Sequence, residues 1–250
     1  MKKKLYLTIA IFAFVLAAIS SFSQTSEKIS KAGTKGNVVF LAVTDGSKML
    51  SEVNTLAAKA QKKYPKSEVI SLDRTDKANA SLVKKYGLAG VPLPVILVLA
   101  PNGAVGGGLQ LKDATPDELV GLIPTKKQAQ ALLAFGDGKT AYIVLFKKSM
   151  KDKAGTIAEC NKAVVDLGGK AVVLEVDLDD KTEAEFLSLL KPDFTATKTH
   201  VLVFNGKGQF TDELVTPVQS AALVAAARKV VKSGCAPGAC GAGTSGCGTK

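Results

Sequence analysis

The chain has 250 residues, a formal net charge of +11 and no tryptophan. Its length suits two domains of ordinary size or one large domain, and its low aromatic content predicts cores packed from aliphatic side chains. The lysines are scattered along predicted helix faces, as at Lys59, Lys62, Lys63 and Lys66, and no aromatic residues alternate with them in a basic stripe, which argues against nucleic-acid binding. We therefore interpret the positive charge as a solvated surface.

Residues 1–23 have the organisation of an export signal. Lysines at positions 2–4 precede an apolar run at residues 5–19, and small residues then precede a cleavage point ahead of Gln24. The run is shorter than the roughly 20 residues of a spanning helix, so we expect no stable membrane insertion after cleavage; an uncleaved anchor is the alternative. Removing residues 1–23 takes away three lysines and no acid, which changes the net charge from +11 to +8. The sequence thus predicts an exported protein, periplasmic or extracellular.

Two halves of the chain repeat one order of segments, roughly a hundred residues apart. Thr115-Pro116 and Thr216-Pro217 also correspond, and each predicts a helix N-cap followed by proline at the first helical position. Each half therefore predicts a strand, a helix, a strand, a helix, a hairpin and a final helix. The matched strands are residues 38–43 and 142–146, 69–76 and 173–180, and 94–99 and 199–204.

Apolar side chains at helical spacing follow the first strand of each half. A strand–helix–strand connection requires parallel pairing, while a hairpin adds antiparallel strands, so each half predicts a mixed sheet with helices on both faces. Pro124 marks the boundary, and residues 126–135 predict a helix that leads into the second half. The apolar helix positions are Met49, Val53, Leu56 and Ala60, and Ile157, Cys160, Val164 and Leu167.

Residues 82–103 combine a helix end, a proline turn, a strand and a hairpin. Gly87 and Gly90 let the chain leave the helix, residues 95–99 form an apolar run typical of a buried strand, and residues 101–103 (Pro-Asn-Gly) predict a hairpin turn. The Tyr-Gly-x-x-Gly-Val-Pro segment at residues 86–92 resembles the second half of a thioredoxin-like domain, where such a segment leads to a cis-proline. The glycine spacing favours Pro92 as that residue, whereas the distance to Gly103 favours Pro94.

This resemblance implies an α/β fold class with two thioredoxin-like domains. The expected domains are residues 25–124 and 125–233, each with a mixed central sheet flanked by helices. Residues 234–250 are rich in glycine and cysteine and poor in bulky apolar residues, so they predict a flexible tail.

The dithiol of redox-active thioredoxins is missing from the sequence. In those relatives the first strand leads to Cys-x-x-Cys at a helix N-terminus, where the helix dipole lowers the pKa of the first thiol. The matching residues here are Thr44, Asp45, Gly46 and Ser47, and residues 147–150 (Lys-Lys-Ser-Met) in the second half. We interpret Thr44, Asp45 and Ser47 as helix caps; an anion or peptide carboxylate bound at this helix start is the alternative. The resemblance thus carries over the fold and not the dithiol activity.

Other residue types that often carry chemistry receive structural interpretations. His200 is the only histidine and has no matched nucleophile, so we expect no catalytic residue there. Asp177, Asp179 and Asp180 lack a calcium-loop pattern and adjoin Lys181, which predicts a solvated turn and a helix start.

The four cysteines fall into two groups. Cys160 lies on an apolar helix face and predicts a buried free thiol. Cys235, Cys240 and Cys247 lie in the tail, and their spacing matches neither the redox motif nor a usual structural zinc pattern. Three thiolates could nonetheless hold Cu(I) or a similar soft metal ion. No cofactor is expected in the two domains.

The function predicted from these features is binding. Thioredoxin relatives pair the backbone before the cis-proline with an extended substrate, which needs no cysteine. The corresponding groove here consists of Val91, Pro92, Leu93 and Pro94. We therefore expect an exported binding or adaptor protein that holds an extended peptide or protein partner, without dithiol catalysis in its domains. The alternative is a thiol-redox or soft-metal-binding protein that acts through its C-terminal cysteines.

Overall fold

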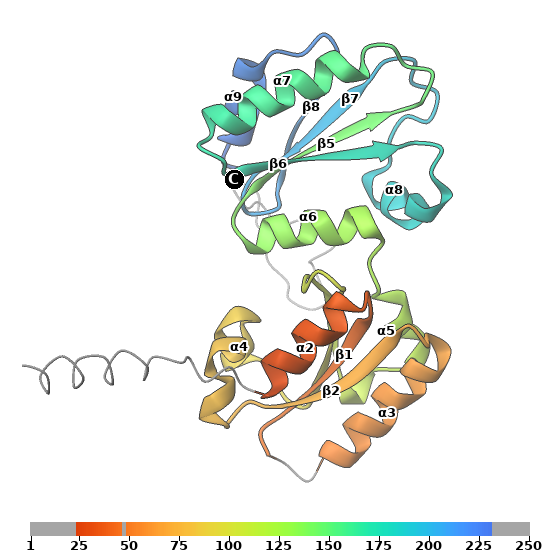
Figure 1. The fold of residues 1–250 in the computed structure, drawn as a ribbon, viewed down its shortest axis with the longest axis vertical. Helices are drawn as coiled ribbons and strands as arrows, with labels where there is room; N and C mark the ends of the chain where they lie inside the picture. Colours follow the sequence, from red (N-terminus) through yellow and green to blue (C-terminus); the bar gives the residue numbers. More distant parts are fainter. Residues whose placement is uncertain (1–23, 47–48, 232–250) are drawn as a thin grey trace, which may run out of the picture. The chain divides into compact units, whose positions relative to one another are not determined.

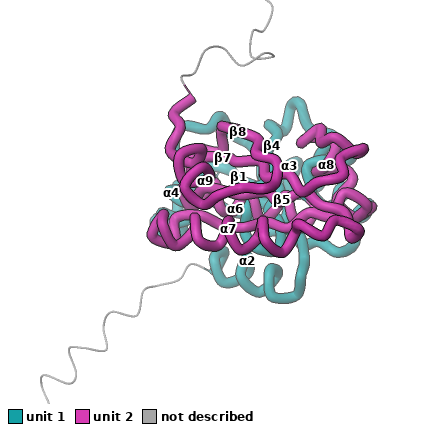
Figure 2. Tube along the Cα trace, turned by 90° about the horizontal axis from the view of Figure 1, so that it is seen from above, with its two compact units in different colours: residues 1–124 teal, residues 125–250 magenta. Residues whose placement is uncertain are grey.

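The computed structural model describes residues 24–46 and 49–231. The chain divides into two compact units, Met1–Pro124 (unit 1) and Thr125–Lys250 (unit 2), coloured separately in Figure 2. The predicted export signal and the cysteine-rich tail lie outside the described residues. Among the helices of the described part, none is long and apolar enough to cross a membrane.

Unit 1 contains one four-stranded mixed sheet in the order β2-β1-β3-β4, of which β1 and β2 are labelled in Figure 1. β1 pairs with β2 in parallel and with β3 antiparallel, and β3 and β4 form an antiparallel hairpin. The elements in chain order are α2 (Gln24–Thr34), β1 (Val38–Thr44), α3 (Leu50–Lys63), β2 (Ser67–Asp73), η2 (Lys77–Asn79), α4 (Ala80–Lys85), η3 (Leu88–Gly90), β3 (Val95–Leu99), β4 (Val105–Gln110), η4 (Leu111–Asp113) and α5 (Pro116–Gly121).

Unit 2 repeats this arrangement with the sheet order β6-β5-β7-β8. β5 pairs in parallel with β6 and antiparallel with β7, and β7 and β8 form the hairpin. The elements are α6 (Lys126–Gly136), β5 (Thr140–Phe146), α7 (Lys153–Asp166), β6 (Ala171–Asp177), η5 (Lys181–Glu183), α8 (Ala184–Leu190), β7 (His200–Phe204), β8 (Phe210–Val215) and α9 (Ser220–Ala227). The predicted repeat and the two mixed sheets are thus confirmed.

Each sheet buries apolar side chains on both of its faces. Successive residues of a strand point to opposite faces, so β1 sends Phe40 and Ala42 towards α3, and Leu41 and Val43 towards the opposite face. The α3 face also contains Leu119 of α5, and the other face contains Ala32 of α2 and Leu82 of α4. Helices therefore cover both sides of the sheet, as the sequence pattern predicts, with α2 as an addition to the expected set.

The helices differ from the sequence predictions at the start of unit 1 and before α9. α2 was not predicted, because its sequence QTSEKISKAGT has few apolar residues and buries only Ala32. Thr115 does cap α5 through a reciprocal capping box with Glu118. The matching prediction for Thr216-Pro217 is wrong: α9 begins at Ser220, and Thr216 instead extends the sheet, its amide donating to the Thr199 carbonyl at 3.1 Å.

Candidate functional site

The segment Val91–Pro94 connects η3 to the central strand β3. Gly87 adopts the left-handed conformation (φ +63°) that ends α4, and η3 then turns the chain towards the sheet. Pro92 is exposed, whereas Val91 and Leu93 are partly buried and pack on the core face that α2 and α4 cover. The Leu93-Pro94 peptide bond is cis, which decides between the two prolines that the sequence left open. The Pro94 carbonyl accepts a hydrogen bond from Leu111 (3.0 Å).

Arg74 fixes the start of this segment. It directly follows β2, and its Nη1 donates to the carbonyls of Leu88 (3.1 Å) and Val91 (2.7 Å). Sequence reasoning missed this residue. The sequence does contain a hint: nearly all basic residues of the chain are lysines, and arginine occurs at only two positions, Arg74 and Arg228. Only a planar guanidinium presents several donors in a fixed fork, which suits two carbonyls on one loop.

The backbone of Leu93 is left available between these anchored neighbours. Within the part of the chain that the structure describes, the Leu93 amide and carbonyl make no hydrogen bond. Such groups are normally paired with protein or water, so an unbonded amide and carbonyl on one partly buried residue offer a docking point to another backbone.

The described residues at the expected dithiol position, Thr44, Asp45 and Gly46, are a strand end and a bend and do not cap a helix. Thr44 is the last residue of β1 and is buried, and its carbonyl accepts from the Arg74 amide (2.7 Å). Asp45 and Gly46 are exposed, Ser47 lies outside the described residues, and α3 begins only at Leu50 with Met49 as its N-cap residue. The interpretation of Thr44 and Asp45 as helix caps is therefore wrong, because the strand lasts one residue longer and the helix starts later than expected.

At the equivalent position of unit 2 a side chain contacts the residue before the strand. Asp152, the N-cap residue of α7, accepts from both the hydroxyl (2.8 Å) and the amide (3.2 Å) of Thr199, the residue just before β7. Burial tends to raise the pKa of Asp152, but the hydrogen bonds from Thr199 outweigh it and hold the pKa below its ordinary value. By the strand register Thr199 matches Pro94, and Lys198 matches Leu93, so the contact from Asp152 holds the residue that takes the place of the cis-proline.

The other singled-out residues are structural in unit 2. His200 Nδ1 lies 2.6 Å from Glu213 Oε1 across the β7–β8 hairpin. Asp180 caps η5 through the Thr182 amide, and Asp177 accepts from the Asp179 amide, as expected for a turn and helix start.

Cys160 is a fully buried free thiol, as predicted, and burial raises its pKa to about 12. No cluster of three metal-binding side chains occurs in residues 24–46 and 49–231. The three tail cysteines lie beyond that range.

Comparison with known proteins gives structural likenesses only. No protein-family model matches the chain, and no curated protein matches it either. The crystal structure of ERdj5 form II is 14% identical over 76% of this chain and 25% of that one, with a TM-score of 0.29. The zinc-bound form of human ERp44 is 11% identical over 81% and 57% of the two chains, with a TM-score of 0.33.

The first two thioredoxin domains of Saccharomyces cerevisiae Eps1p are 10% identical to this chain, over 82% of this chain and 94% of that one, with a TM-score of 0.28. The present chain spans only a quarter of the ERdj5 chain and just over half of the ERp44 chain. Because these TM-scores are low, we assign the fold from the topology of each unit. By its parallel β-α-β start, its antiparallel hairpin and its final helix, each unit has a thioredoxin-like fold.

Proposed function

We propose that this thioredoxin-fold protein is an exported binding or adaptor protein that holds an extended segment of a partner along Val91, Pro92, Leu93 and Pro94. The observation that carries the proposal is the unbonded amide and carbonyl of Leu93, held in place by the Arg74 contacts to Leu88 and Val91. A partner strand would supply one acceptor and one donor to Leu93, which is strand addition. Export is proposed from the signal-like residues 1–23 alone.

The proposed binding needs no dithiol chemistry. Thiol–disulfide exchange requires a thiolate that attacks through a mixed disulfide, and residues 44–47 supply no sulfur. Cys160 does not replace it, since its thiol is inaccessible and its pKa of about 12 keeps it protonated at neutral pH.

The test is site-specific photocrosslinking in the native compartment. A photoreactive amino acid replaces Pro92 in one variant and Thr197 in a matched control. Both positions are exposed, and each lies three residues before the first residue of its strand, β3 or β7. We expect crosslinked partners from position 92 and none from position 197. Equal crosslinking at both positions, or none at position 92, would contradict the proposal.

A synthetic peptide copied from the crosslinked segment then tests the binding mode. Strand addition depends on backbone hydrogen bonds, so N-methylation of the peptide amide opposite Leu93 should weaken binding about tenfold, while N-methylation of the next amide should have little effect. Equal effects of the two methylations would mean that side chains alone hold the peptide.

The alternative function, thiol or soft-metal chemistry, is favoured by one observation. Because Cys160 is sealed in the core, any reactive thiol of this chain must come from Cys235, Cys240 or Cys247. Deleting residues 234–250 should therefore remove all insulin-reducing activity and all bound copper or zinc in elemental analysis. Activity that survives the deletion would exclude the tail as its source.

A further inference from the structure

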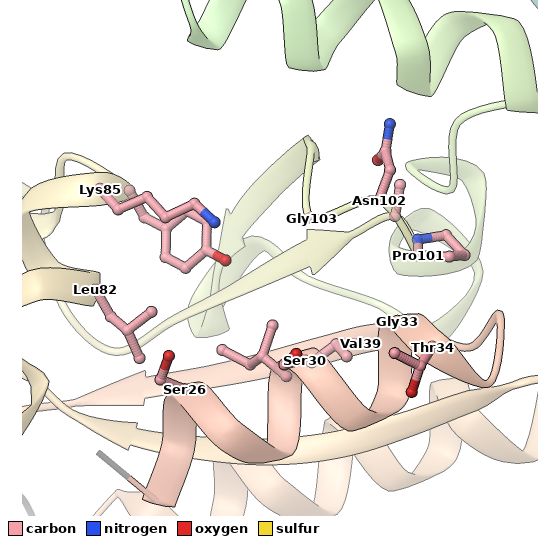
Figure 3. A pocket seen from close by; sticks show the side chains of 13 residues that line it. Ser26, Ser30, Gly33, Thr34, Val39, Leu82, Lys85, Pro101, Asn102 and Gly103 are labelled. Atoms are coloured by element: carbon pink, nitrogen blue, oxygen red, sulfur yellow. The ribbon is translucent and has the colours of Figure 1, made fainter. Parts of the chain in front are cut away.

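A pocket of about 440 Å³ lies in unit 1 at the far end of the sheet from the proposed groove. α2, α4, the start of β1 and the β3–β4 turn line it (Figure 3). Val39 lines the pocket and pairs with Leu99, whereas Val43, at the other end of β1, pairs with Val95 beside Pro94. The pocket is therefore separate from the proposed peptide site. Its volume falls within the range of about 300–1,000 Å³ typical of small-molecule sites.

Unit 2 fills the corresponding space with a phenyl ring. Gly33 and Phe135 occupy matched positions, each shortly before the first strand of its unit. The Phe135 ring packs on Phe204, with centroids 5.8 Å apart, and lies 3.3 Å from where a Cβ on Gly208 of the β7–β8 turn would be. Gly33 lacks a side chain, and a Cβ there would meet the Pro101 carbonyl oxygen at 2.4 Å. Unit 1 thus excludes the side chain that occupies this space in its repeat.

One positive charge lies at the rim of the pocket. The Lys85 ammonium sits 5.2 Å from the centre of the Tyr86 ring and 3.7 Å from where a Cβ on Gly103 would be, which places it between α4 and the β3–β4 turn. No acidic residue lines the pocket, and no carboxylate of the described residues lies within ion-pair distance of Lys85. Figure 3 shows Lys85 across the pocket from Asn102 of the turn.

The hydroxyl of Tyr86 is a second group without a partner. It is buried and makes no hydrogen bond among the described residues, and burial raises the pKa of Tyr86, so the hydroxyl remains a donor at neutral pH. A buried donor without an acceptor costs free energy that an incoming acceptor would recover. Ile29, Val39 and Leu82 supply an apolar lining beside it.

We propose that this pocket binds a small monocarboxylate with an apolar body of about the size of a phenyl ring. The carboxylate accepts from the Lys85 ammonium and the Tyr86 hydroxyl, and the apolar body takes the space that Phe135 occupies in unit 2. A charged acceptor matches both unpaired donors, and charge-assisted hydrogen bonds of this kind are the stronger ones.

Calorimetric titration of the full chain with phenylbutyrate tests the proposal, with phenylbutanol as the neutral probe of the same shape. We expect saturable binding of phenylbutyrate and at least about tenfold weaker binding of the alcohol. Lys85→Leu, which introduces the residue found at the matched position 189, should reduce phenylbutyrate affinity about tenfold. Lys84→Leu, an equally exposed neighbour that does not line the pocket, should leave it unchanged.

Tyr86→Phe separates the hydroxyl from the ring. The variant should be at least as stable as the wild type without ligand, because it removes an unpaired buried donor, and should bind phenylbutyrate several-fold more weakly. Circular dichroism melting confirms that each variant is folded. No saturable binding by the folded wild type, equal affinity for acid and alcohol, or unchanged affinity in both folded Lys85→Leu and Tyr86→Phe would overturn the proposal.

Discussion

The residue after the second strand differs between the two units although its backbone makes the same bond. The Arg74 amide donates to the Thr44 carbonyl at 2.7 Å, and the Leu178 amide donates to the Phe146 carbonyl at 2.8 Å. Leu178 is buried in the core of unit 2, whereas Arg74 reaches two carbonyls of the loop that leads to Pro94. The fold itself therefore accepts an apolar residue here. The Arg74 guanidinium of unit 1 therefore holds the loop that forms the proposed groove.

In a second matched pair the charged residue lies in unit 2 and the neutral residue in unit 1. Asn79 and Glu183 both end a short 3₁₀ turn and are both buried. Glu183 accepts from the Thr125 hydroxyl and from the Lys127 amide (3.0 Å), so it holds the first turn of α6. Asn79 donates to the Asp73 carbonyl (2.9 Å), and its Oδ1 has no partner among the described residues. Among residues 24–46 and 49–231, only unit 2 has a carboxylate that ties this turn to its first helix.

Glu183→Ala should cause the largest loss of stability. It leaves the Lys127 amide and the Thr125 hydroxyl without their acceptor in a buried setting, and we expect unit 2 to lose about 3 kcal/mol. Native-state hydrogen exchange resolves the effect by unit. The exposed Glu185→Ala should change the stability by less than about 0.5 kcal/mol. A loss as small for Glu183 as for Glu185 would show that the carboxylate does not hold α6.

Arg74→Ala should have the next largest effect, a loss of about 2 kcal/mol in unit 1, because two charge-assisted hydrogen bonds disappear. The amides of residues 88–93 should exchange faster than in the wild type. Arg74→Lys should recover at most half of the loss, since the flexible ammonium does not fix the directions of its donors as the planar guanidinium fixes the two hydrogens of Nη1. Full recovery by lysine would mean that charge rather than geometry holds the loop, and Lys77→Ala serves as the exposed control.

The sequence predicted the sheets well because the central strands are unbroken apolar runs buried on both faces, and because the repeat doubles the signal. The apolar run at residues 95–99 and the Thr115-Pro116 helix start are local patterns, and both hold in the structure. Side-chain contacts across the fold could not be predicted in the same way. Arg74, Asp152 and Glu183 act on residues 14 to 58 positions away, and no local pattern specifies such partners. Thr216-Pro217 misled because a Thr-Pro pair fits a turn as well as a helix start.

Asp152→Ala tests how much the contact between Asp152 and Thr199 stabilises unit 2. At neutral pH the variant should lose about 1.5 kcal/mol, since the amide and hydroxyl of Thr199 lose their acceptor. The pKa of Asp152 is lowered in the folded protein, so its contribution is present above the ordinary value of 3.8 and disappears as the pH falls below it. The difference between wild type and variant, measured by urea unfolding, should therefore shrink from pH 5 to pH 2. A constant difference over that range would exclude the charged carboxylate as the cause.

Tyr142→Phe should have the smallest effect on stability, and it gives unit 2 the residue type that unit 1 has at the matched position. Phe40 and Tyr142 occupy the same position of the first strand and are both fully buried, so a ring without a hydroxyl is already known to pack there in unit 1. The Tyr142 hydroxyl donates to the Leu223 carbonyl at 3.2 Å, inside α9, where that carbonyl keeps its position in the helical ladder without the tyrosine. We expect a loss of about 0.5–1 kcal/mol. Because burial raises the pKa of Tyr142, the loss should be the same at pH 7 and pH 9, in contrast to the pH-dependent loss for Asp152. A loss above about 2 kcal/mol would mean that the Leu223 carbonyl depends on this hydroxyl after all.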